Sequence, residues 1–228
     1  MEKETIQKSK YFLYLAISFV AVLMISNTVA VKIVSIGNLY LTGAILIFPL
    51  SYIFGDILTE VYGYRASRKI IWSGFVAMIF MSFIYWLVQI IPAAPFWANQ
   101  QSYKIILGGV PRVVLGSIIG YFAGEFLNSY VLSKMKIWTN GRYLWTRTVS
   151  STVVGEGVDS ILFGLIAFGG LIPLNNLLPM IAVSYLIKVA YEILATPITY
   201  LIVNKIRHAE NMDVYDKGVK YNPFIISQ

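Results

Sequence analysis

Charged residues at helical spacing interrupt the apolar segments of this 228-residue sequence. Three pairs have a spacing that places both members on one face of a helix: Asp56 with Glu60, Glu156 with Asp159, and Lys188 with Glu192. An ionisable group in the bilayer core costs at least about 2.5–3.5 kcal/mol, so it occurs where it is paired, faces a cavity or has a function. These pairs could bind a polar solute, carry a proton or form structural ion pairs.

Depth in the bilayer distinguishes the three pairs. At about 1.5 Å per residue, Glu156 and Asp159 lie about 12–17 Å into their predicted helix, and Lys188 lies about 15 Å into its own from the opposite side. We therefore predict that these three residues meet near the midplane, where transporters place substrates and coupling ions. The alternative is a structural ion pair between Lys188 and one acid, but it leaves the other carboxylate without a cation.

The remaining candidates lie nearer the ends of the predicted helices. For Asp56 and Glu60 the alternative to a transport role is a solvated helix end paired with Arg65 or Arg68. Four further polar residues join the six paired residues in the predicted substrate-binding and transport set: Asn27, Lys32, Arg112 and Glu125. Amide and cationic groups would supply the donors that ring carbonyls and ring nitrogens of a solute need.

Glycines recur every four residues in the segment that contains Arg112 and Glu125. Gly116, Gly120 and Gly124 lie on one face of the predicted helix. Small residues at this spacing let helix backbones approach closely. The stripe therefore predicts a helix-packing face.

Apolar blocks long enough to cross a bilayer position these residues. A spanning helix needs about 20 mostly apolar residues, and six segments qualify: residues 11–31, 39–58, 70–91, 110–132, 148–168 and 178–203. The chain is 57% hydrophobic and 13% charged, whereas a soluble domain carries about 25% charged residues. We predict an all-α integral membrane protein, with a transport domain over residues 11–204 between cytoplasmic tails at 1–10 and 205–228.

Basic residues concentrate on one side of the predicted helices. Fourteen of the 18 lysines and arginines fall in the two tails and in the loops after the second and fourth segments. The other loops contain only Lys32 and Lys104. The positive-inside rule then places both termini in the cytoplasm. The net charge of +7 is thus a topology signal, and nucleic-acid binding is rejected.

Metal and thiol chemistry is excluded by composition. The chain has no cysteine and one histidine, His208, so a disulfide scaffold, a cysteine nucleophile and a zinc or haem site lack their residues. No Ser-His arrangement or phosphate-binding loop is present either. We predict no cofactor, no metal and no enzyme activity. The remote alternative is an intramembrane enzyme that uses Asp56 and Glu60.

Longer motifs connect the candidate residues. The most specific are Asp56–Gly63 (DILTEVYG) and Ser151–Ser160 (STVVGEGVDS), which occur together with Ser26-Asn27, Phe48-Pro49, Gly124-Glu125 and a Lys188 that precedes Pro197. From about Ser26 to Pro197 the chain resembles the queuosine precursor transporter family, also called the vitamin uptake transporter family. Glu125 and Glu156 depart from its pattern, because relatives often carry glutamine at both positions.

The resemblance implies a function and a fold. The function is import, across the inner membrane, of 7-deazaguanine bases such as preQ0, preQ1 or queuine for salvage into transfer-RNA queuosine. The fold is a six-helix bundle similar to the substrate-binding subunits of energy-coupling-factor transporters. Two mechanisms stay open: proton-coupled import, or a binding subunit for a vitamin-like solute that needs an ATP-driven partner. The expected partners are the small molecule, membrane lipid and, in a symporter, protons.

Overall fold

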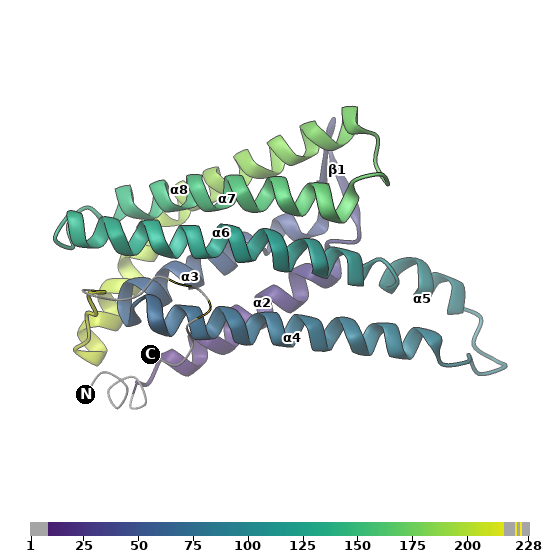
Figure 1. Cartoon of the computed structure of the whole chain (residues 1–228), viewed down its shortest axis with the longest axis horizontal. Coiled ribbons are helices and arrows are strands. Elements are labelled where there is room, and N and C mark those ends of the chain that lie inside the picture. Colours follow the sequence, from purple (N-terminus) through teal and green to yellow (C-terminus); the bar gives the residue numbers. More distant parts are fainter. Residues whose placement is uncertain (1–8, 217–221, 223, 225–228) are drawn as a thin grey trace.

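Long apolar helices make up most of the structure, a computed structural model that describes residues 9–216, 222 and 224. Five stretches of these residues are long and apolar enough to cross a bilayer: α2 (Phe12–Val29), α4 (Tyr64–Ile90), α5 with α6 (Gln100–Trp138), α7 (Leu144–Phe168) and α8 (Leu174–Glu210). They run side by side in an elongated bundle (Figure 1). The predicted class, a helical integral membrane protein, is confirmed.

The predicted second helix, residues 39–58, is wrong as a continuous element. This region forms an antiparallel hairpin, a 3-10 turn and a short helix: β1 (Ile33–Ile36), β2 (Leu39–Thr42), η1 (Gly43–Leu46) and α3 (Pro49–Tyr62). Gly37 adopts a φ of +62° in the two-residue turn between the strands, which favours a hairpin. Pro49 lacks an N–H, so it suits the first turn of α3 but would break a longer helix.

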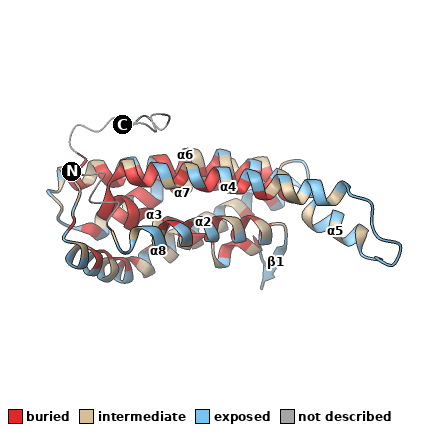
Figure 2. Ribbon diagram, turned by 90° about the horizontal axis from the view of Figure 1, so that it is seen from below, coloured by how far each residue is buried: buried red, intermediate tan, exposed pale blue. Residues whose placement is uncertain are grey.

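The short helix α3 is more completely buried than the five long stretches. Nearly every residue of α3 is buried, and its 14 residues give a length of about 21 Å, shorter than the hydrocarbon core of about 30 Å. The long helices instead bury one face and expose apolar residues on the other. On α8 the exposed apolar residues include Leu194 and Leu201. Figure 2 shows this division, with α5 (Gln100–Leu107) and the loop before it exposed beyond the bundle.

The two ends of the described chain meet at one end of the bundle. The Ser9 hydroxyl donates to Glu210 Oε1 at 2.7 Å, next to the start of α2 and the end of α8. Helix α8 continues to Glu210, so the first part of the tail predicted from residue 205 is helical. Residues 1–8, 217–221, 223 and 225–228 of the two predicted tails lie outside the described residues, and these include Lys3, Lys8, Lys217 and Lys220.

The three glycines of the stripe lie where α6 (Val110–Trp138) contacts α7. A Cβ at Gly116 would lie 3.2 Å from the backbone N of Ala167. At Gly120 it would lie 2.9 Å from the carbonyl oxygen of Asp159, and at Gly124 it would lie 2.7 Å from that of Gly155. Real Cβ contacts are longer, so the two backbones approach to a distance that only glycine permits.

Replacing Gly124 by alanine should destabilise the bundle. The added methyl would press on the Gly155 carbonyl and on the Asp159 Cβ, each 2.7 Å away, and overpacking of this kind costs about 1–3 kcal/mol. Gly157→Ala is the matched control, because its nearest neighbour outside its own helix is Tyr185 Cε2 at 3.7 Å. Thermal unfolding of both purified variants in detergent measures the difference. Equal midpoints would contradict the close approach of α6 and α7.

Candidate functional site

A buried ion group joins α7 to α8. Lys188 Nζ lies 2.8 Å from Glu156 Oε2 and 2.8 Å from Asp159 Oδ2. It also lies 4.3 Å from the centroid of the Phe48 ring, within the range of a cation–π contact. All three charged side chains are buried. The structure therefore brings together the three residues that the sequence placed at one depth, with two carboxylates around one ammonium.

A cavity opens beside this ion group. It contains about 550 Å³ of space free of protein atoms, part of it open to solvent, and α2, the β2–α3 segment, α6, α7 and α8 all contribute to its wall. Its polar lining is Ser26, Asn27, Thr42, Ser117, Asp159, Ser160, Ser184 and Lys188, and its aromatic lining is Phe48, Phe163 and Phe168. Mostly apolar walls with a few convergent polar groups are typical of small-molecule sites.

Among the described residues, two that line this cavity each carry a buried side-chain oxygen without a hydrogen-bond donor. The two atoms are Asn27 Oδ1 and Asp159 Oδ1, on side chains that are 2% and 1% exposed. The amide nitrogen of Asn27 is occupied, because it donates to the Leu23 carbonyl oxygen at 2.8 Å. An unpaired buried acceptor costs about 1–3 kcal/mol. An N–H donor that reached either oxygen would remove this cost at that position.

A second pair of acids lies between α3 and α8, outside the cavity lining. Asp56 and Glu192 are buried and their carboxyl groups are within hydrogen-bonding reach of each other. Asn128 Nδ2 on α6 donates to Asp56 Oδ1 at 2.8 Å. Sequence reasoning missed Asn128, although its position three residues after Glu125 on one helix face was a usable signal.

Glu125 lies on the same side of α6 as Asn128. The Ser129 hydroxyl donates to Glu125 Oε1 at 3.3 Å, while Oε2 has no donor among the described residues. Glycine at position 55 of α3 leaves the space that this carboxyl group occupies. Glu125 is therefore a buried acid next to the second pair and not part of the cavity wall.

Glu60 belongs to a separate ion network at the end of the bundle where Ser9 and Glu210 meet. Its Oε1 lies 3.0 Å from the buried Arg147 guanidinium, 3.7 Å from Lys136 Nζ, and in contact with Arg207. Its partners thus come from α7, α6 and α8, and not from Arg65 or Arg68 as the alternative reading of the sequence proposed. Asp213 joins the network through Lys136 at 2.8 Å.

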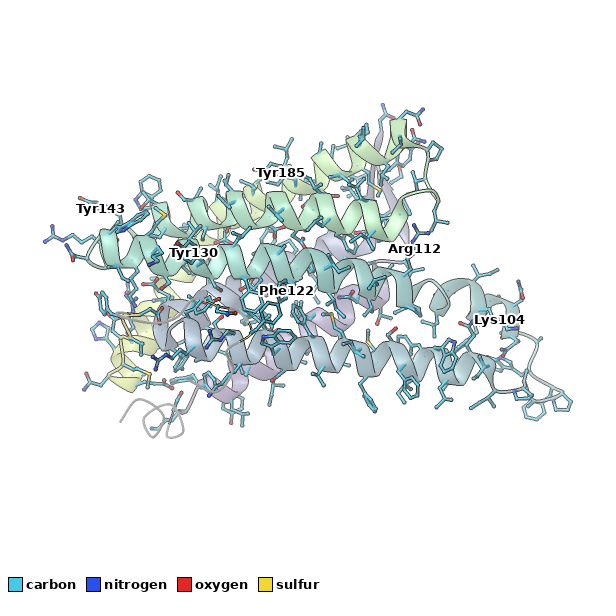
Figure 3. All side chains as sticks on the ribbon, viewed as in Figure 1. Lys104, Arg112, Phe122, Tyr130, Tyr143 and Tyr185 are labelled. Carbon is cyan, nitrogen blue, oxygen red and sulfur yellow. The ribbon has the colours of Figure 1, made fainter. Side chains whose placement is uncertain are left out.

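Of the ten predicted site residues, Asn27, Asp159 and Lys188 line the cavity, and two of the others, Arg112 and Lys32, lie far from its buried charges. Arg112 is exposed, and its guanidinium donates to the Ile166 and Gly169 carbonyl oxygens, which satisfies backbone acceptors at the C-terminal end of α7. Figure 3 shows Arg112 at the opposite end of the bundle from Tyr143. Lys32 is exposed just before β1. Both therefore lie apart from the buried group around Lys188.

Helices long and apolar enough to cross a membrane surround a mostly apolar cavity with a few polar groups, an arrangement typical of multi-pass membrane proteins that bind a solute. The family model described as "Putative vitamin uptake transporter" matches residues 42–202. The chain belongs to this family of transporters, which confirms the predicted family, the multi-pass membrane localisation and the prediction that it is not an enzyme.

A curated relative agrees with the family match. A Bacillus subtilis (strain 168) protein named "Probable queuosine precursor transporter" is 31% identical over 176 residues, which cover 77% of each chain. No solved structure matches the chain.

Neutralising Glu60 should destabilise the protein. In Glu60→Gln the fully buried Arg147 loses its carboxylate, and leaving a buried charge unpaired costs about 3–5 kcal/mol. Asp213→Asn is the matched control, since Asp213 pairs with Lys136 and Arg207 of the same network but its side chain is 39% exposed, and exposed pairs contribute about 0–1 kcal/mol. Thermal unfolding in detergent should separate the two variants. A larger loss in Asp213→Asn would show that the network is organised differently.

Proposed function

We propose that this chain imports a small, flat, polar solute of the queuosine precursor class across the cell membrane. The observation that carries the proposal is that Asn27 and Asp159, which line one cavity, each carry an unsatisfied buried acceptor oxygen, Oδ1. A 7-deazaguanine base presents a ring N–H and an amino group on one edge. An ionised carboxylate accepts both, and charge-assisted hydrogen bonds are the stronger kind.

The rest of the cavity suits the same ligand class. Phe48, Phe163 and Phe168 offer apolar walls for the faces of a planar ring. The hydroxyls of Ser117, Thr42 and Ser184 can donate to ring acceptors. The name of the Bacillus subtilis relative supports this substrate class. The imported base would be salvaged into transfer-RNA queuosine.

The proposal includes six membrane crossings with both termini in the cytoplasm. Five long stretches alone would place the two chain ends on opposite sides of the bilayer, yet Ser9 and Glu210 are in contact. The β2–η1–α3 segment supplies the return crossing, in the interior of the bundle, where non-helical backbone is tolerated beside a cavity. The concentration of basic residues at that end supports a cytoplasmic location. A bundle of this kind would resemble the substrate-binding subunits of energy-coupling-factor transporters.

Import against a gradient needs an energy source, and protons are the source we propose. The bundle contains more buried carboxylates than cations at the depth of the cavity, which favours exchange of a proton. In the competing mechanism this chain only binds the solute and an ATP-driven partner moves it. Uptake by the purified chain alone in liposomes, with and without an inward proton gradient, distinguishes the two.

Cysteine labelling tests the topology. Cysteines introduced at Asn99 and Asn175, which are exposed at the α5 and α8 starts, should react with an impermeant thiol reagent added outside intact cells. A cysteine at the exposed Asn140, between α6 and α7, should react only after the cells are opened. The absence of native cysteines makes the background low. The reverse pattern would refute the orientation.

Substitutions in the ion group test the substrate site. Asp159→Asn and Lys188→Met each remove one partner of the buried group, and a loss of about 3–5 kcal/mol corresponds to roughly several hundred-fold or more in affinity. Uptake of radiolabelled preQ1 into liposomes should therefore be lost. Lys32→Met is the matched control for the lysine, because Lys32 is exposed outside the cavity, and it should transport normally. If Asp159→Asn and Lys188→Met both took up preQ1 at the wild-type rate, Glu156, Asp159 and Lys188 would have only a structural role.

A further inference from the structure

The carboxyl groups of Asp56 and Glu192 face each other across the contact between α3 and α8. The two side chains are 0% and 2% exposed, and neither lines the cavity. Glu192 lies one helical turn beyond Lys188, about 6 Å further along α8. The pair therefore lies between the cavity and the end of the bundle that carries the Glu60 network.

A contact between two carboxyl groups has a chemical requirement. An ionised carboxylate has acceptors only, so a hydrogen bond between two carboxyl groups needs a proton on one of them. Asp56 Oδ2 and Glu192 Oε1 have no donor among the described residues. The fully buried Asn128 donates to Asp56 but leaves its own acceptor, Oδ1, without a partner. A proton bound to one of the two carboxyl groups would supply the hydrogen-bond donor that is missing between them.

Charged neighbours do not neutralise the pair. Glu125 on α6 and Glu156 on α7 lie near the pair, and both are acids, so neither supplies a positive charge. Glu60, one turn along α3, is occupied by its own cations. Lys188, one turn along α8, is held by Glu156 and Asp159. Among the described residues no group of acids could hold a metal ion. A proton is therefore the cation that fits this site.

We propose that Asp56 and Glu192 form the coupling-proton site of the import cycle, separate from the substrate cavity. The inference rests on the proposed function. With the proton bound, the shared hydrogen bond holds α3 against α8 and keeps the cavity closed toward the cytoplasm. When the proton leaves to the cytoplasmic water, two carboxylates remain in contact in an apolar interior. Their repulsion separates the short helix α3 from α8 and opens the path for the solute.

Two neutral variants test the coupling. The full chain is reconstituted in liposomes, and uptake of radiolabelled preQ1 is compared with and without an acidic exterior. Asp56→Asn and Glu192→Gln should bind preQ1 with wild-type affinity but lose the acceleration by the gradient, so that the ratio of the two rates falls to unity. The exchanged pair Asp56→Glu with Glu192→Asp keeps both carboxyl groups and should restore the acceleration. Glu210→Gln, outside both sites, should respond as the wild type does.

A second measurement does not depend on transport. The purified wild type should show infrared carbonyl absorption from buried protonated carboxyl groups, and the double neutral variant should lose the part of it that the Asp56–Glu192 pair contributes. An infrared band that is unchanged in the double variant would overturn the inference. So would neutral variants whose uptake is still accelerated by the gradient, or neutral variants that no longer bind preQ1. Acceleration of uptake by a sodium gradient in place of a proton gradient would overturn it as well. Gradient-independent uptake by the wild type would overturn only the coupling site, whereas a wild type that does not bind preQ1 would overturn the proposed function.

Discussion

Burial of the Lys188 ammonium between Glu156 and Asp159 constrains much of the structure around it. A charge taken out of water is stable only where partners surround it at close range, so α7 and α8 are held in one register. The glycine stripe of α6 lets that helix reach the backbone of Asp159 itself. Phe48, just before α3, closes the remaining side of the ammonium. One ion group thus positions four segments of the cavity wall.

Polar residues continue from this group toward one end of the bundle in successive layers. The Asp56–Glu192 pair comes next, and the Glu60 network forms the last layer. The backbone of Val214 closes this end, since its N–H donates to the Val61 carbonyl and its own carbonyl accepts from Lys136. A solute that leaves the cavity in this direction has to separate these contacts. Their strength therefore bears on how readily the cavity opens at this end of the bundle.

Several features followed from the sequence because they depend on local rules. Composition and apolar length predicted the membrane class, and the depth of Glu156, Asp159 and Lys188 predicted that they meet. The hairpin and the short helix α3 were missed, because residues 39–58 are as apolar as a spanning helix and the turn at Gly37 lies just before them. A short helix inside a bundle and a helix in lipid have the same apolar composition.

By itself, the sequence determined that this is a multi-pass helical protein with charges buried at its centre, since hydropathy, spacing and depth are properties of single segments. Only the tertiary structure decided which charges become partners. It assigned Glu60 to Arg147, Lys136 and Arg207, joined Asp56 to Asn128 and Glu192, and placed Arg112 at the end of α7. Such partnerships depend on the rotation of each helix about its axis and on which helices are neighbours, and packing between distant segments sets both.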